Sequence, residues 1–412
     1  MEKAISSNTY DKLLFLLILC LPLYRFGTTL GAPGVLLTIA YIPFLLEYIV
    51  SSESLRTFLL FFICWFLYGI VSIAWTPFGA DYRIESYLLF IHSTMFLEIL
   101  VLATKANRPF STIANAWTLI LLLTTLVGLW EITTDQHLFN AREESEMRNN
   151  ELGETMSMKY AAVSFYNYNT FCWFMCLAFP FVLYNLSKSK TFIHALYCTI
   201  TMLFAIYIML TNASRGGLIS IGIMFVLYFV LYVFKRRSYD RRLYTIASFF
   251  VVIFLILSNR DFFETILFRL EGKTALEDNS RLLLWGNSLS KFLDSYGFGQ
   301  GVGSMIPALK SCHNSFIYYS HNMILEFLLV YGVFVSAGFI YLLWKLFIRG
   351  IKTKNVYKKI VLLAGIIPFP FYSVINSENL RPMPIWCFFA SICVFALYLK
   401  DDDNSKELKL AK

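Results

Sequence analysis

Blocks of about 20 apolar residues, separated by short polar segments, recur along the whole chain. Each block is long enough for a helix that crosses the hydrocarbon core of a bilayer, where backbone polar groups must be paired within the segment. The pattern predicts an all-α polytopic membrane protein with about twelve transmembrane helices, in which residues 1–412 form a single integral membrane domain. The predicted spans lie near residues 12–26, 34–50, 57–75, 84–104, 113–132, 161–186, 191–211, 216–234, 243–258, 322–344, 360–377 and 384–399.

Composition and charge agree with this class and suggest an orientation. Of the residues, 58% are hydrophobic and only 15% are charged, which leaves no separate soluble domain. Most of the 35 Lys and Arg residues lie in segments that the predicted topology places on one side. Short cytoplasmic loops retain such residues, so both termini are predicted to be cytoplasmic. The net charge of +8 is then explained by anionic lipids at the inner surface, without nucleic acid as a partner.

Two long polar segments fall on the other, external side of this topology. Residues 133–160 form an acidic external loop, and its segment "AREESEMRNNELGE" is either a mobile lid or a solvated helix, with the helix favoured by its charge pattern. Residues 259–321 form a larger external loop. Loops of this length are usually functional or disordered. The larger loop also holds most of the candidate chemistry, so it is predicted to carry the active site.

A short helix is predicted inside the larger loop, over "DNSRLLLWGNSLSKFLDSYG". Asp278 or Asn279 is a candidate N-cap, and apolar residues follow at helical spacing. Such a helix would either lie against the membrane or roof a cavity. Glycines then alternate at 297, 299, 301 and 303, which does not match a dinucleotide-binding motif, so a flexible turn is the interpretation.

Three arginines on the external side are candidates for binding phosphate. Arg215 stands at a helix junction in "LTNASRGGLISI", where Gly216 and Gly217 permit close helix approach, although an interfacial arginine can also simply extend toward water. Arg281 begins the loop helix and Arg381 lies in "NSENLRPMP". Guanidinium groups match phosphate oxygens with bidentate hydrogen bonds, and few acidic residues are expected beside these three on the external face. A lipid-linked phosphate is the ligand that this set favours.

A histidine at the start of an apolar segment is the candidate base. His321 titrates near neutral pH, so it could take a proton from an attacking hydroxyl, although a single histidine at a helix end is often structural. Asn322 and Glu326 follow it, and Glu326 either orients this polar end or packs against another helix. His313 is an alternative base. No cluster of Asp residues is spaced to hold a divalent ion, so metal-free and cofactor-free chemistry is expected.

Several segments together resemble the O-antigen ligase and Wzy-type polysaccharide polymerase superfamily of bacterial inner-membrane glycosyltransferases. Its signature of His-Asn, nine residues and Gly is similar to "HNMILEFLLVYG". The chain also contains "TNASRGG", similar to a Ser-Arg-Gly helix junction, and the loop segment "SRLLLWGNSLSKFLDSYGFGQGVGS". Two further segments, "WEITTDQHLFN" and "SFYNYNTFCWFMCLAFPFVL", are similar to the first external loop and following helix of members that polymerise capsules and exopolysaccharides. One departure is that the second glycine expected soon after Gly332 is delayed to Gly338.

The resemblance implies transfer of a glycan from undecaprenyl diphosphate to an acceptor hydroxyl on the periplasmic face of the inner membrane. Arg215 and Arg281 would hold the diphosphate and His321 would activate the acceptor. Asn322, Arg381 and Glu326 would support them. The implied partners are the lipid-linked glycan, an acceptor glycolipid, membrane lipids and a chain-length regulator.

Four functional hypotheses follow. The first is polymerisation of surface polysaccharide repeat units, as in O-antigen, capsule or exopolysaccharide, and the second is ligation of the finished glycan to lipid A-core. A flippase or transporter of lipid-linked glycans is a hypothesis of another class, but the two halves of the chain do not look alike. The fourth is a non-catalytic assembly partner in the envelope.

Overall fold

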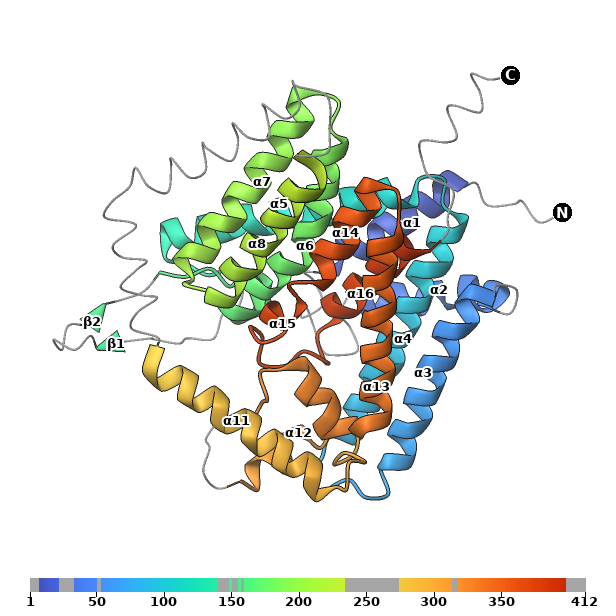
Figure 1. The fold of residues 1–412 in the computed structure, drawn as a ribbon, viewed down its shortest axis with the longest axis vertical. Coiled ribbons are helices and arrows are strands. Elements are labelled where there is room, and N and C mark those ends of the chain that lie inside the picture. The colour runs from blue at the N-terminus through green and yellow to red at the C-terminus, as the bar shows by residue number, and fades with distance from the viewer. Residues whose placement is uncertain are drawn as a thin grey trace.

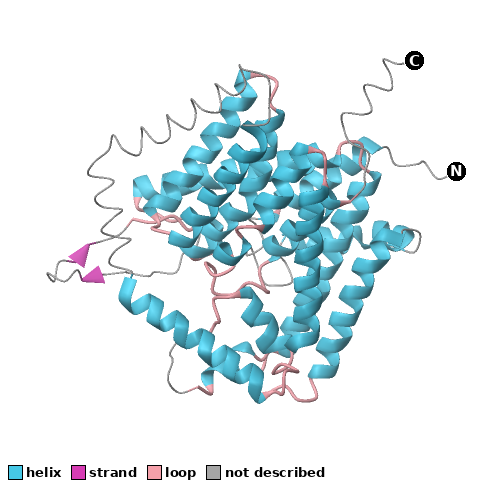
Figure 2. Cartoon of the chain, in the orientation of Figure 1, coloured by secondary structure: helices cyan, strands magenta, loops and turns pink. Residues whose placement is uncertain are grey.

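The computed structural model describes residues 7–21, 33–49, 53–138, 148–149, 155–156, 159–233, 274–312 and 318–397, and this part of the chain is mainly helical (Figure 1 and Figure 2). The α-helices are α1 (Ser7–Leu19), α2 (Pro33–Ile49), α3 (Glu53–Ser72), α4 (Tyr82–Lys105), α5 (Pro109–Thr134), α6 (Tyr168–Lys188), α7 (Phe192–Thr211), α8 (Arg215–Tyr228), α11 (Thr274–Asp294), α12 (Met305–Lys310), α13 (Met323–Lys352), α14 (Val356–Ile366), α15 (Phe369–Tyr372) and α16 (Met383–Ala396). Two short helical segments, η2 (Val163–Phe165) and η3 (Phe229–Val233), complete the set.

Helix α6 is the centre of the bundle. Every residue from Thr170 to Asn185 is buried, and the helix packs against α5, α7, α8, α14 and α16. A helix that is apolar on all sides belongs inside a bundle, because no face of it suits water. The span predicted at 161–186 begins too early, since residues 159–167 are not α-helical and α6 begins at Tyr168.

Six helical segments of the described chain are long and apolar enough to cross a membrane. They are α4, α5, α6, α7, α8 with most of η3, and α13. Shorter apolar helices lie at Pro33–Ile42, Phe58–Ser72 and Met383–Ala396. The prediction of a helical membrane protein is confirmed. The predicted number of about twelve spans is not confirmed, and the span expected at 243–258 lies outside the described residues.

The predicted external loop 133–160 contains a small strand pair. β1 (Arg148–Asn149) and β2 (Thr155–Met156) are antiparallel, with Arg148 opposite Met156. The solvated helix favoured from the charge pattern of "AREESEMRNNELGE" is therefore wrong at Arg148 and Asn149. Charge pattern alone does not separate the two, because a solvated helix and a short hairpin both expose polar side chains.

Residues that the sequence places on one side of the membrane do meet at one end of the bundle. The Asp11 carboxylate accepts hydrogen bonds from the backbone N–H groups of Asn107 and Arg108, both at 3.1 Å. The Lys188 ammonium lies 5.0 Å from the centre of the Tyr357 ring. Contacts of this kind join the α1, α4, α6 and α14 ends, as the predicted grouping of basic segments requires.

A kink at Gly332 divides α13. Its φ of 69° and ψ of −168° are non-helical, so the hydrogen-bond ladder is interrupted there. The carbonyl of Leu329 accepts from Gln300 N at 2.7 Å, and that of Val330 accepts from Gly301 N at 3.0 Å. The glycine-rich segment after α11 thus supplies donors to carbonyls that the kink leaves without helical partners.

The same glycine-rich segment is anchored to α3 and is therefore not the flexible turn expected from the sequence. The Trp75 indole N–H donates to Gly299 O at 2.9 Å, and Val302 N donates to the Ser72 hydroxyl at 2.9 Å. Gly297, Gly299, Gly301 and Gly303 all have positive φ. A Cβ at Gly299 would lie 2.5 Å from Gly332 N, so the alternating glycines allow two backbones to touch.

Replacing Gly332 with alanine is expected to lower the free energy of unfolding by about 1–3 kcal/mol, because its backbone region is nearly restricted to glycine. The added Cβ would also lie 2.3 Å from the carbonyl carbon of Phe298. Thermal unfolding in detergent micelles measures the effect. Gly222→Ala in α8 is the control, because a Cβ there meets no atom within 4 Å. Equal melting temperatures for Gly332→Ala and the wild type would contradict the account of the kink.

Candidate functional site

His321 and Asn322 form the polar start of α13. The Asn322 side chain caps the helix by accepting hydrogen bonds from Ile324 N at 3.0 Å and Leu325 N at 3.3 Å. His321 has a φ of 49°, a left-handed conformation that is uncommon for a residue other than glycine. Its buried Nδ1 has no hydrogen-bond partner among the described residues. The capped helix end therefore holds the imidazole in a defined place, with the buried Nδ1 unpaired among the described residues.

The environment of His321 favours the neutral imidazole. Burial, and to a smaller extent the positive charge of Arg281 on α11, lowers its pKa from 6.5 to about 4. The structure thus brings two of the sequence candidates close enough for the charge of one to act on the other. A neutral imidazole beside a guanidinium can accept a proton while the guanidinium holds an anion.

Arg215 is the first residue of α8 and follows a tight connection from α7. Ala213 in this connection has a φ of 49°. Gly216 lies against the segment before α16, since a Cβ there would be 2.9 Å from Ile375 Cγ1 and 3.1 Å from Phe371 O. The predicted close approach at this glycine is confirmed, and its consequence is that Arg215 stands beside residues 371–375.

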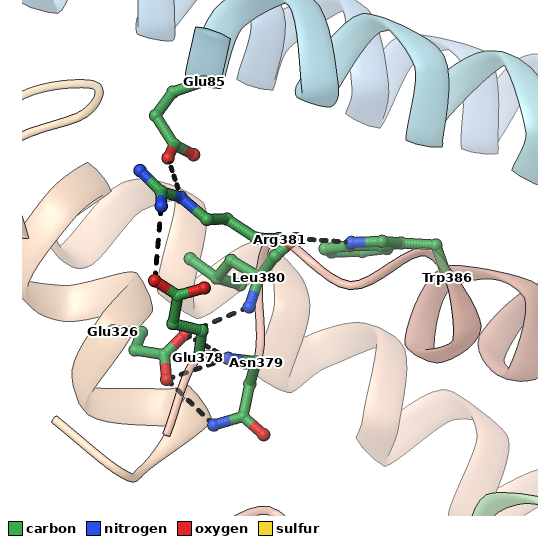
Figure 3. A network of polar contacts seen from close by, with 7 residues as sticks. All are labelled: Glu85, Glu326, Glu378, Asn379, Leu380, Arg381 and Trp386. Carbon is green, nitrogen blue, oxygen red and sulfur yellow. Dashed lines mark hydrogen bonds and ion pairs between the residues drawn. The ribbon is translucent and has the colours of Figure 1, made fainter. Parts of the chain in front are cut away.

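Glu326 holds the segment that continues from there (Figure 3). Its buried carboxylate accepts hydrogen bonds from Asn379 N at 2.8 Å, Asn379 Nδ2 at 2.8 Å and Leu380 N at 3.0 Å. Trp386 at the start of α16 donates its indole N–H to Leu380 O at 2.9 Å. The structure thus shows Glu326 as a buried carboxylate whose hydrogen bonds orient the loop at Asn379 and Leu380.

Arg381 is bound by two carboxylates, Glu85 at the start of α4 and Glu378 (Figure 3). The Nη1 to Glu378 Oε1 distance is 3.2 Å. Burial lowers the pKa of Arg381, but the charges of Glu85 and Glu378 outweigh burial and raise it, so the guanidinium stays charged. The expectation that few acidic residues stand beside the arginines is wrong here, because the chain folds Glu85 onto a residue far away in sequence. Arg381 ties α4 to the loop.

These contacts link the candidate residues through one segment, residues 371–382. It touches the start of α8 beside Arg215, and Glu326 fastens it to the helix that begins after His321. Glu85, Glu326, Glu378 and Arg381 also line a small pocket with Gly303, Met305, Ile306, Val330, Tyr331 and Leu380. His313, the alternative base, lies outside the described residues.

Two buried polar residues that the sequence reasoning missed support the turn before α8. The fully buried Glu131 carboxylate accepts from Ala162 N at 2.8 Å and Val163 N at 2.9 Å. Asn212 accepts from Ala161 N and donates to Ala161 O, both at 2.9 Å. Residues 161–163 are thereby held between α5 and the α7–α8 turn. A signal was present, because a carboxylate within an apolar span needs a partner.

Comparison with known proteins gives two matches. Residues 200–340 match the family model described as O-Antigen ligase, a range that includes Arg215, Arg281 and His321. The chain is also 26% identical, over 362 residues, to the teichuronic acid biosynthesis protein TuaE of Bacillus subtilis (strain 168). That alignment covers 82% of this chain and 71% of the Bacillus protein. Both matches agree with the resemblance found in the sequence motifs.

Proposed function

We propose that this chain is a member of the O-antigen ligase and Wzy polymerase superfamily, which both matches support, and that it transfers a glycan from undecaprenyl diphosphate to an acceptor hydroxyl. The product is a lengthened surface polysaccharide. The observation that carries the proposal is the buried His321 beside the charge of Arg281, at the capped start of α13. A base and a phosphate-binding cation at one place are what displacement of a diphosphate requires.

In the proposed reaction, the neutral imidazole of His321 takes the proton of the acceptor hydroxyl. The acceptor oxygen forms a bond to the anomeric carbon of the donor glycan as the bond from that carbon to the diphosphate oxygen breaks. The bonding electrons leave with the diphosphate, whose added negative charge is stabilised by Arg281 and Arg215. Guanidinium groups suit this task because they stay charged and bind two oxygens at once.

The pH dependence of the reaction tests the assignment of His321. Since its pKa is lowered from 6.5 to about 4, the unliganded enzyme keeps a neutral imidazole as the pH falls below 6.5. The acid limb of kcat/KM is therefore expected near pH 4, and that of kcat at a higher pH. The bound diphosphate causes this difference, because its negative charge offsets that of Arg281. Transfer rates measured from pH 4 upward test this expectation. Acid limbs of kcat/KM and kcat that both lie near pH 6.5 would contradict it.

We place this chemistry at the external face of the bacterial inner membrane, with both termini in the cytoplasm. Support comes from the basic segments that meet at the end of the bundle remote from His321 in the predicted topology. The reaction is proposed to need no metal, because the arginines supply the positive charge that a metal supplies in other transferases. An acceptor glycolipid and a chain-length regulator are the proposed partners.

Polymerisation is preferred to ligation on lipid A-core. The similarity to a teichuronic acid biosynthesis protein supports synthesis of a surface polysaccharide, and so do the two motifs that resemble polymerases. The acceptor is then a second lipid-linked repeat unit. Ligation differs only in the acceptor, since the donor and the chemistry at the diphosphate are the same.

Reconstitution tests these alternatives directly. The purified chain in proteoliposomes is given an undecaprenyl-diphosphate-linked repeat unit, with and without EDTA, and products are separated by size. A ladder of lengthened lipid-linked glycans that persists in EDTA is expected, and Arg215→Ala and Arg281→Ala should abolish it. Glycan found only on added lipid A-core would indicate a ligase. Donor movement across the bilayer without any new glycosidic bond would overturn the proposal in favour of a flippase.

A further inference from the structure

Helix α11 exposes leucine side chains on its outer face and buries two polar side chains on its inner face. Leu282, Leu289 and Leu293 lie on one face of the helix and are 62%, 46% and 62% exposed. On the opposite side, Asn287 and Ser288 are buried together with Leu284. A helix at the surface of a water-soluble domain shows the reverse arrangement, with leucines inside and amides and hydroxyls outside. The exposed leucine face therefore needs an apolar environment that the described chain does not itself provide.

The exposed face of α11 continues into the surface that a membrane would cover. The Phe298 ring, 50% exposed, lies 6.0 Å from the ring of Phe334, which is 62% exposed. Phe334 belongs to α13, one of the helices long and apolar enough to span a bilayer. Lipid contacts the outer side of such a helix, so the same lipid extends to Phe298 and from there to α11. In Figure 1 α11 lies across one end of the bundle, and it packs against α12 and α13.

Exposed aromatic side chains indicate that this surface lies at the boundary between hydrocarbon and headgroups. Trp75, Phe78 and Tyr296 are 41%, 105% and 92% exposed near the ends of α3 and α11. Trp75 remains amphipathic, since its indole N–H donates to Gly299 O while its ring stays partly exposed. Tryptophan and tyrosine are enriched where hydrocarbon meets headgroups, because one part of the side chain is apolar and the other polar.

We propose that α11 is an interfacial helix, with the face of Leu282, Leu289 and Leu293 inserted into phospholipid at the His321 end of the bundle. The leucines contact acyl chains, and Asn287 and Ser288 face the protein. Amphipathic helices bind a bilayer surface in this way, with the apolar face buried in the boundary between headgroups and acyl chains. Of the two positions left open by the sequence, the helix takes the one against the membrane.

One consequence rests on the proposed function. The charge of Arg281 acts on His321 from this same helix. A helix in the interface holds that guanidinium at the depth of lipid headgroups. A lipid-linked diphosphate occupies the same depth, so the donor reaches Arg281 without leaving the membrane.

Spin labels test the position of the helix without using enzyme activity. Cysteines replace Leu289, Leu293 and, as the control, Asp294, whose side chain is 55% exposed on a polar edge. The background is a chain whose exposed or half-exposed Cys20, Cys64 and Cys312 are serine. In proteoliposomes, labels at 289 and 293 are expected to collide several-fold more with oxygen than with a water-soluble nickel chelate. The label at 294 should show the reverse.

Two outcomes overturn the proposal. Free access of the nickel chelate to 289 and 293 would place the leucine face in water. Low access of both reagents would show that protein, such as a second copy of this chain, covers it. A benzophenone amino acid at position 289 distinguishes the same outcomes in native membranes without altering cysteines, because it crosslinks either to phospholipid or to protein. Neither readout changes if the glycosyl transfer proposal fails.

Discussion

Replacing His321 with asparagine is expected to lower kcat for glycan transfer by about 10²–10⁴-fold, the usual contribution of a general base. The imidazole is buried with Nδ1 unpaired among the described residues, and burial together with the charge of Arg281 lowers its pKa and favours the neutral form. Asparagine is the better substitution because it tolerates the left-handed backbone that His321 adopts at a φ of 49°. Loss of activity then reports the missing base and not local strain.

The measurement is single-turnover transfer in proteoliposomes, with membrane expression and melting temperature followed beside it. KM for the lipid-linked donor should change little, since binding of the diphosphate is assigned to Arg215 and Arg281. Arg281→Lys serves as the companion variant, and it should raise KM because a lysine cannot make the bidentate contact. Normal transfer by His321→Asn would refute the general-base assignment and direct attention to His313.

Replacing Glu326 with alanine is expected to lower the free energy of unfolding by about 3–9 kcal/mol. The substitution leaves three buried or partly buried donors without their acceptor, each at a cost of about 1–3 kcal/mol. These donors are Asn379 N, Asn379 Nδ2 and Leu380 N. Glu326 is itself fully buried, so water does not replace the lost carboxylate without rearrangement. The melting temperature in micelles should fall well below that of Gly332→Ala.

Glu378→Gln is the matched control for Glu326→Ala. Its side chain is 16% exposed and makes a single described ion pair, while Arg381 keeps its contact with Glu85. Its effect on stability should be within about 1 kcal/mol, the usual range for a partly solvated pair. If Glu326→Ala unfolds at the wild-type temperature, the loop at residues 376–382 is not held by this carboxylate.

The sequence alone determined the class of the protein and the approximate place of most helices, and its motifs already showed the resemblance that the family model supports. Apolar blocks of about 20 residues report membrane helices directly, because a bilayer leaves the backbone few alternatives. The loop helix was also predicted, although it begins at Thr274 and not at the N-cap candidates Asp278 or Asn279. Periodicity locates a helix but does not locate its first turn, where capping and tertiary contacts decide.

Only the tertiary structure decided how the polar residues are used. Arg381 was read as one of three arginines with few acidic neighbours, yet it pairs with Glu85, which lies 296 positions away. The sequence shows Glu326 only as a carboxylate in an apolar segment, and the fold shows that it bonds to Asn379. At the Gly332 kink, two carbonyls of α13 accept hydrogen bonds from the glycine-rich segment after α11. Such pairings join distant parts of the chain, so neither spacing nor composition specifies them, whereas hydrophobic length is a local property that one segment carries by itself.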